Sequence, residues 1–138
     1  MNVCDVMTTR IVTVDMDDRL TVAKEILDSV SFRHLLVTEN NKLQGVISEL
    51  DLLRSLSPFL GTAAERTRDA VTIHQRVHQI MSRSPITVKP DASIRDALDI
   101  MLNNNIGCLP VLESEQIQGI FTLHDGVRAL LDEFPSGD

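Results

Sequence analysis

The sequence predicts an α+β fold of two β-α-β-β-α units, packed sheet to sheet about a pseudo-twofold axis with the helices outside. Three observations support this prediction. The chain contains an internal repeat, each repeat shows the order strand, helix, hairpin, helix, and 43% of the residues are hydrophobic although Trp and Tyr are absent. Cores built from Val, Ile, Leu, Met and Ala suit sheets that are covered by helices.

The internal repeat relates residues 3–56 to residues 77–130 at one constant offset of 74, without a gap. Fifteen of the 54 aligned positions are identical, whereas chance at roughly 6% per position would give about three. Such self-similarity indicates a duplicated structural unit. We therefore divide the chain into repeat 1 (1–56), a linker of helix-favouring composition (57–76), repeat 2 (77–134) and a frayed tail (135–138), with the two repeats forming one domain.

Each repeat is expected to open with a short strand, at Ile11–Val14 in repeat 1 and Ile86–Val88 in repeat 2. A helix follows, because apolar residues recur at helical spacing over 20–30 and over 94–102. Ser93 stands immediately before the second of these patterns, where an N-cap residue belongs.

A hairpin and a second helix complete each repeat. Two apolar runs joined by a short polar turn predict the hairpins, at Leu35–Val37 with Gly45–Ile47 and at Leu109–Leu112 with Gly119–Phe121. The closing helices are expected at Leu50–Leu56 and His124–Leu131. One such unit is too small to bury both faces of a three-stranded sheet, so the two copies are expected to pack together.

The pattern Gly-x-x-[Ser/Thr]-x-x-Asp occurs once in each repeat, at Gly45–Asp51 and Gly119–Asp125. Each copy places a hydroxyl at the end of a strand and an acid in the first turn of the next helix. Ser48 and Thr122 could be helix N-caps, with the acid favoured near the positive end of the helix. The same arrangement could present N–H groups and a hydroxyl to a phosphate, and a carboxylate to ribose hydroxyls. Both interpretations stay open.

The succession Met-Thr-x-x-Ile-Val-Thr-Val, helix, Leu-Pro-Val and Gly-Ile-Phe-Thr-x-x-Asp resembles the CBS motif, and its tandem pair resembles a Bateman module. The resemblance covers residues 3–56 and 77–131. It implies a regulatory module that binds AMP, ADP, ATP, S-adenosylmethionine or a related adenosyl compound in two clefts between the motifs. The alternative is an assembly module whose clefts are vestigial.

The resemblance also implies roles for individual residues. Asp51 and Asp125 match the ribose-binding acid of the family, and Ser48 and Thr122 match its phosphate-binding hydroxyl. The segment whose backbone reads the edge of adenine corresponds to Arg10, Ile11 and Val12 in repeat 1 and to Ser84, Pro85 and Ile86 in repeat 2.

Three further positions border the base or the phosphates in this resemblance. His34 and Cys108 lie just ahead of the second strand's core, and Arg33 aligns with a basic phosphate contact of some members. The counterpart of Arg33 is Gly107, so the two clefts should differ in phosphate affinity. Arg33 as a solvated cation and His34 as a partly buried histidine are the structural alternatives.

Composition argues against several other classes of function. The net charge of −7 disfavours nucleic acid as a partner, and no apolar run approaches the roughly 18 residues of a membrane helix. Cys4 and Cys108 indicate reduced thiols of a cytoplasmic protein. His74 and His78 are four residues apart but lack a third zinc ligand. We expect no enzyme, no metal and no cofactor.

Self-association and an unidentified effector protein are the expected partners. The resemblance implies a homodimer formed through helices. Leu27, Leu53 and Leu130 are expected to lie on the apolar helix surface that a second copy would cover.

Overall fold

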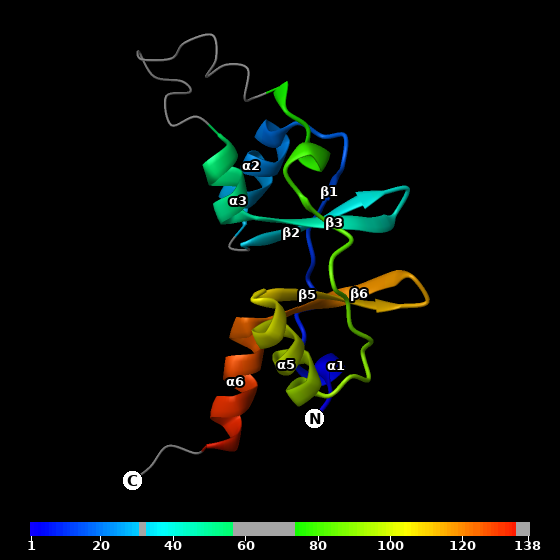
Figure 1. Cartoon of the computed structure of the whole chain (residues 1–138), viewed down its shortest axis with the longest axis vertical. Coiled ribbons are helices and arrows are strands. Elements are labelled where there is room, and N and C mark those ends of the chain that lie inside the picture. The colour runs from blue at the N-terminus through cyan, green and yellow to red at the C-terminus, as the bar shows by residue number, and fades with distance from the viewer. Residues whose placement is uncertain (31–32, 57–73, 135–138) are drawn as a thin grey trace. The chain divides into compact units, whose positions relative to one another are not determined.

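The computed structural model describes residues 1–30, 33–56 and 74–134 (Figure 1). The chain divides into two compact units, Met1–Ile11 with Ile86–Asp138 (unit 1) and Val12–Pro85 (unit 2). The α+β fold class is confirmed, since each unit packs helices against a sheet whose strand pairs are mostly antiparallel. Most of the expected helical linker and all of the tail 135–138 lie outside the described residues.

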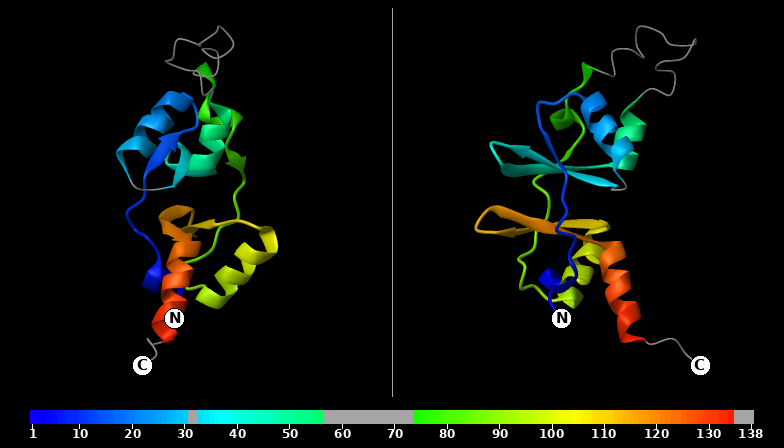
Figure 2. Two further views of the ribbon diagram at one scale, coloured as in Figure 1. Left: turned by 90° about the vertical axis from the view of Figure 1, so that its left-hand side faces the viewer. Right: turned by 180° about the vertical axis from the view of Figure 1, so that it is seen from behind.

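Unit 2 contains a four-stranded sheet of order β1-β2-β3-β4, with β1 parallel to β2 and the other pairs antiparallel. Helices α2 and α3 pack beside each other over this sheet (Figures 1 and 2). Its elements are β1 (Thr13–Asp15), α2 (Leu20–Ser29), β2 (His34–Glu39), β3 (Lys42–Ser48), α3 (Glu49–Ser55), the 3-10 turn η2 (Val77–Gln79) and β4 (Ser82–Arg83).

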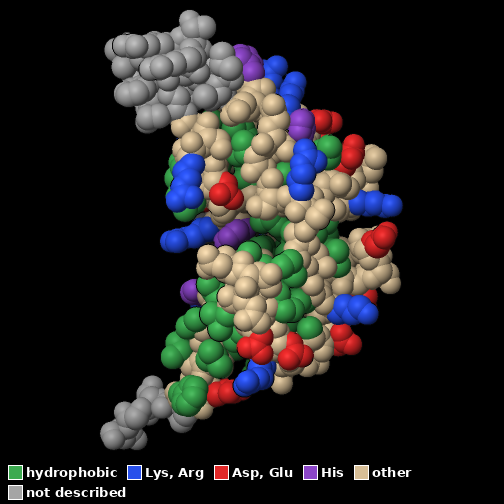
Figure 3. All heavy atoms as spheres, in the orientation of Figure 1, with side chains coloured by type: hydrophobic (Ala, Val, Ile, Leu, Met, Phe, Trp, Pro, Cys, Tyr) green, Lys and Arg blue, Asp and Glu red, His purple; other side chains and the backbone are tan. Residues whose placement is uncertain are grey.

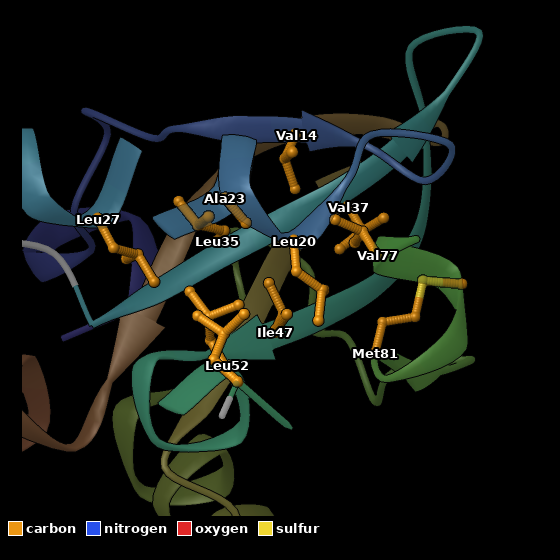
Figure 4. Packing of buried hydrophobic residues seen from close by; sticks show 11 residues of the cluster. Val14, Leu20, Ala23, Leu27, Leu35, Val37, Ile47, Leu52, Val77 and Met81 are labelled. Carbon is orange, nitrogen blue, oxygen red and sulfur yellow. The ribbon is translucent and has the colours of Figure 1, made fainter. Parts of the chain in front are cut away.

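The core of unit 2 forms where the helices meet the sheet (Figure 4). Leu20, Leu35 and Ile47 are fully buried, and Leu52 of α3 is 1% exposed. Burying an aliphatic side chain of this size contributes about 1.5–3 kcal/mol. The helical spacing in residues 20–30 is thus explained by burial of Leu20, Ala23 and Leu27 on one face of α2.

Unit 1 repeats this arrangement with a two-stranded sheet, and α5 and α6 lie on one face of it (Figure 2). Its elements are α1 (Val3–Val6), α5 (Ile94–Asn104), β5 (Cys108–Glu113), β6 (Gln116–Thr122) and α6 (Leu123–Glu133). Phe121, Leu109 and Met101 form the centre of its core. The predicted cap is confirmed, because the Ser93 hydroxyl accepts the Asp96 N–H at 3.0 Å.

The leading segment of each repeat packs on the other repeat. In unit 1, Thr8 and Ile120 exchange two backbone hydrogen bonds of 2.9 Å. In unit 2, Ser82 of the second repeat pairs with Val46 in the matching position. Each compact unit therefore combines the start of one repeat with the hairpin and helices of the other.

A glycine permits each of these crossings. A Cβ atom on Gly119 would lie 2.6 Å from the Thr8 carbonyl oxygen, and one on Gly45 would lie 2.6 Å from that of Ser82. Backbone atoms cannot come this close to a side chain. The glycine of the Gly-x-x-[Ser/Thr]-x-x-Asp pattern is therefore required by the close approach of a second chain segment.

The expected strand at Ile86–Val88 is wrong, because only Val88 pairs there, as an isolated bridge to Val111. Two prolines explain the difference. In repeat 1 the strand is extended by hydrogen bonds from the Leu36 N–H to Val12 and from the Met16 N–H to Thr38. The counterparts of Leu36 and Met16 are Pro110 and Pro90, which have no N–H to donate. The strand expected at Ile11–Val14 forms at Thr13–Asp15.

The other predicted elements agree with the structure to within a few residues, whereas α1, η2 and β4 were not predicted. The two hairpins turn at Asn40–Asn41 and Ser114–Glu115, all with positive φ, as two-residue hairpin turns of the primed type require. In the described part of the chain, no helix is both long and apolar enough to cross a membrane.

Candidate functional site

In unit 2, four of the predicted site residues gather at the end of the β2–β3 hairpin away from its turn. His34 pairs with Ser48 across the two strands. The Ser48 hydroxyl accepts the Asp51 N–H at 3.0 Å, and the Asp51 carboxylate accepts the Ser48 N–H at 3.4 Å. Arg33 is exposed beside His34. A cation, an imidazole, a hydroxyl and a carboxylate thus share one end of this hairpin.

Unit 1 builds the same arrangement from different side chains. Cys108 pairs with Thr122, the Thr122 hydroxyl accepts the Asp125 N–H at 3.2 Å, and the Asp125 carboxylate accepts the Thr122 N–H at 3.0 Å. The Thr8 hydroxyl, from the other repeat, lies 3.2 and 3.3 Å from the two Asp125 oxygens. Sequence reasoning missed Thr8. The sequence feature that could have identified it is a hydroxyl residue at the same position of each repeat, Thr8 in repeat 1 and Ser82 in repeat 2.

The N-cap interpretation of the two hydroxyls is confirmed, and the expected supply of free helix N–H groups is largely wrong. The first amide of α3, on Glu49, donates to the Arg33 carbonyl at 2.7 Å, and that of α6, on Leu123, donates to the Gly107 carbonyl at 3.1 Å. The third amide of each helix donates to the cap. At both helix starts the capping hydroxyl keeps its own proton, whereas two of the first three helix amides already have acceptors.

The segments matched to adenine recognition follow the crossing residues Thr8 and Ser82. Arg10 and Ile11 lie in unit 1 and Ser84 and Pro85 in unit 2. Arg10 and Ser84 are exposed, Ile11 and Pro85 are half-buried, and within the described residues their backbones form no hydrogen bonds with protein. Backbone donors and acceptors without partners are the groups that can read the edge of a base.

The last residue of each of these segments lies in the other unit. The Val12 carbonyl accepts a hydrogen bond from Leu36 at 3.2 Å and is already used by the sheet. Its counterpart Ile86 is 40% exposed. In repeat 2 the residue that corresponds to Leu36 is Pro110, which has no N–H. The Ile86 carbonyl therefore has no equivalent of the hydrogen bond that Leu36 donates to Val12.

The charge of the neighbouring aspartate affects the pKa of both His34 and Cys108. The pKa of His34 is lowered, mainly by burial. The negative charge of Asp51 raises this pKa and the positive charge of Arg33 lowers it, with burial the largest effect, so the ring is neutral at pH 7. Burial, reinforced by the charge of Asp125, raises the pKa of Cys108 to about 12. The thiolate, not the thiol, is the nucleophilic form, so Cys108 has no nucleophilic activation.

The histidine pair His74 and His78 lies outside these two sites. His78 lies 3.9 Å from an Asp17 carboxylate oxygen, and His74 is exposed. Among the described residues, no group of three or more His, Cys, Asp or Glu side chains could hold a metal ion.

The family model for the CBS domain matches this chain twice, at residues 3–58 and 77–132. A CBS domain-containing protein of Dictyostelium discoideum is 32% identical over 128 residues, which cover 91% of this chain and 88% of that protein.

Solved structures of CBS pairs share the fold. The structure of CBSX2 in complex with AMP superposes with a TM-score of 0.79 at 29% identity, covering 97% of this chain and 98% of that one. The CBS domain pair of protein MJ0100, in complex with 5′-methylthioadenosine and S-adenosyl-L-methionine, gives a TM-score of 0.79 at 21% identity, with 96% and 98% covered.

Proposed function

Because this chain belongs to the CBS domain family, we propose that it is a regulatory module that binds an adenine nucleotide or another adenosyl ligand. The observation that carries the proposal is the doubled site, a capped helix start with a half-buried aspartate in each unit. Two copies of one polar arrangement, with different side chains at the flanking positions, support binding more strongly than a single helix cap would. The adenosyl compounds bound by CBSX2 and MJ0100 indicate the ligand class.

In this proposal each site is assembled where the start of one repeat lies against the end of the other. Asp51 and Asp125 accept hydrogen bonds from ribose hydroxyls, and the hydroxyls of Ser48 and Thr122 donate to phosphate, since only their lone pairs are used by the caps. The exposed backbone beside Ser84 and beside Arg10 reads the base.

The two sites should prefer different ligands. Arg33 and neutral His34 flank Asp51, whereas Gly107 and the protonated thiol of Cys108 flank Asp125. A guanidinium group attracts phosphate, so we assign the more highly phosphorylated ligand to the site of unit 2.

AMP, ADP or ATP is expected to stabilise the chain against heat. A ligand at about 100 times its Kd adds roughly 2.7 kcal/mol, which raises the Tm of a domain of this size by several degrees. Thermal shift measurements with millimolar AMP, ADP, ATP, S-adenosylmethionine and methylthioadenosine test this, with guanosine and GMP as controls. Melting curves that stay unchanged across the whole adenosyl panel would contradict the proposal and favour the assembly module.

No catalytic role is part of this proposal, and the regulatory signal passes to an effector protein in the cytoplasm.

We propose further that the chain forms a homodimer. The apolar surface that supports this lies on α6 and its C-cap residue (Figure 3), where exposed apolar side chains fall at helical spacing on one face: Leu123, Val127, Leu130, Leu131 and the C-cap Phe134. Leu53 is also exposed, but the expectation for Leu27 is wrong, since it is buried in the core of unit 2.

Light scattering is expected to give a dimer of about 31 kDa, twice the chain mass of 15.4 kDa. Val127 is 52% exposed, so Val127→Glu should leave the fold intact and dissociate the dimer by placing two charges in a desolvated interface. Val22→Glu, on the surface of α2 in unit 2, is the matched control. A monomer at every concentration of the unmodified chain would overturn the dimer.

A further inference from the structure

The Thr8 hydroxyl lies across both oxygens of the Asp125 carboxylate, 3.2 Å from one and 3.3 Å from the other. This contact joins residues 117 positions apart, and the backbone around Thr8 is held by its two hydrogen bonds to Ile120. The backbone that carries the Thr8 hydroxyl is therefore fixed by hydrogen bonds of its own.

Among the described residues, no hydroxyl makes such a contact with the Asp51 carboxylate of unit 2. Ser82 occupies the position of Thr8, but within the described residues no hydrogen bond joins it to Asp51. In the part of the chain that the structure describes, the Asp51 carboxylate accepts only the Ser48 N–H, at 3.4 Å. The Asp125 carboxylate accepts the Thr122 N–H at 3.0 Å as well as the Thr8 hydroxyl. The two acids that the sequence makes equivalent are thus unequal as acceptors.

A hydroxyl shared between two carboxylate oxygens is also the arrangement that a ribose hydroxyl would make with the same acid. Resting on the function proposed above, we propose that Thr8 occupies the ribose position of the Asp125 site in the ligand-free protein. A nucleoside competes with the Thr8 hydroxyl for the carboxylate, so the Asp125 site binds more weakly than the Asp51 site and fills second.

The neighbouring groups are consistent with competition rather than with a role for Thr8 in orienting the acid. The Asp125 carboxylate is already held by the Thr122 N–H at 3.0 Å, and the backbone N–H of Asp125 donates to the Thr122 hydroxyl at 3.2 Å. Removing the Thr8 hydroxyl would leave the carboxylate in place with both oxygens more accessible.

The test uses the full chain and adenosine as the probe, measured by calorimetry on variants that carry Asp51→Ala to isolate the second site. Thr8→Val keeps the shape of the side chain and removes the hydroxyl. It should tighten adenosine binding about tenfold, the lower end expected for a hydrogen bond to a charged group. Thr8→Ser keeps the hydroxyl and should bind as the unmodified residue does.

A second probe separates competition from a general change in the site. 2′,3′-Dideoxyadenosine lacks the 2′- and 3′-hydroxyls that would compete with Thr8, so its affinity should be the same with Thr8 and with Thr8→Val. Unchanged or weaker adenosine binding in Thr8→Val, with an intact melting curve, would overturn the assignment of Thr8 alone. Absence of adenosyl binding to the unmodified chain would instead contradict the proposed function.

Discussion

Asp51→Ala and Asp125→Ala should each weaken adenosine binding at the affected site by roughly 10 to 100-fold, while the fold survives. A hydrogen bond to a charged carboxylate contributes about 1.5–3 kcal/mol, and every 1.4 kcal/mol changes the Kd about tenfold. Both acids are half-buried at the start of a helix, so the variants also lose about 0.3–1 kcal/mol of stability through the helix dipole. Calorimetry gives the affinities, and thermal melts give the stabilities.

Arg33→Ala is the matched variant for this experiment. Arg33 is exposed, and its only described hydrogen bond uses its carbonyl, which the substitution keeps. It should weaken ATP and ADP binding more than adenosine binding, because its proposed partner is phosphate. Unchanged adenosine affinities in both Asp variants, with unchanged melting curves, would leave the two acids with only a structural role in helix capping. Equal losses of adenosine and ATP in Arg33→Ala would reject its phosphate contact.

Gly119→Ala and Gly45→Ala should each destabilise the fold by about 3 kcal/mol, the upper range for a side chain forced into a packed site. The added methyl group would meet a carbonyl oxygen of the crossing segment at 2.6 Å, together with the sulfur of Met7 at 3.1 Å or of Met81 at 2.7 Å. The methionine can move, but the carbonyl is held by its own hydrogen bond. The Tm should fall by about 10 °C.

Gly107→Ala is the control for these two variants. A Cβ there would meet only the Leu123 side chain, at 3.7 Å, which is ordinary van der Waals contact. Its melting temperature should stay within a few degrees of that of the unmodified chain. If Gly119→Ala melts as Gly107→Ala does, the crossing segment is not held at the distance that the structure gives.

The sequence alone was sufficient for the repeat, the α+β class and the family, because each depends on information local to one repeat. Helical spacing identified the buried face of α2, and the Ser93 cap was readable from its position before the first helical turn. The hydroxyl and the acid three residues apart predicted the capping arrangements at Ser48 and Thr122. The assignment of ligand roles to the site residues stays a prediction.

Only the tertiary structure decided which hairpin each leading segment crosses. Because the repeats are alike, Met7 and Thr8 could pair with the glycine of either repeat, Gly45 or Gly119. Nothing in the sequence favours one of these pairings over the other. The structure selects the opposite repeat, through the Thr8–Ile120 and Ser82–Val46 pairs. That choice brings Thr8 to Asp125, 117 residues away.

The same physical reason explains the remaining differences. Pro90 and Pro110 shorten a strand only because their missing N–H groups would have faced specific carbonyls across the sheet. The first amides of α3 and α6 donate hydrogen bonds to the carbonyls of Arg33 and Gly107. Local chemistry determined which elements form and which side chains begin them. Long-range hydrogen bonding decided which segments meet, and thereby how the two aspartates came to differ.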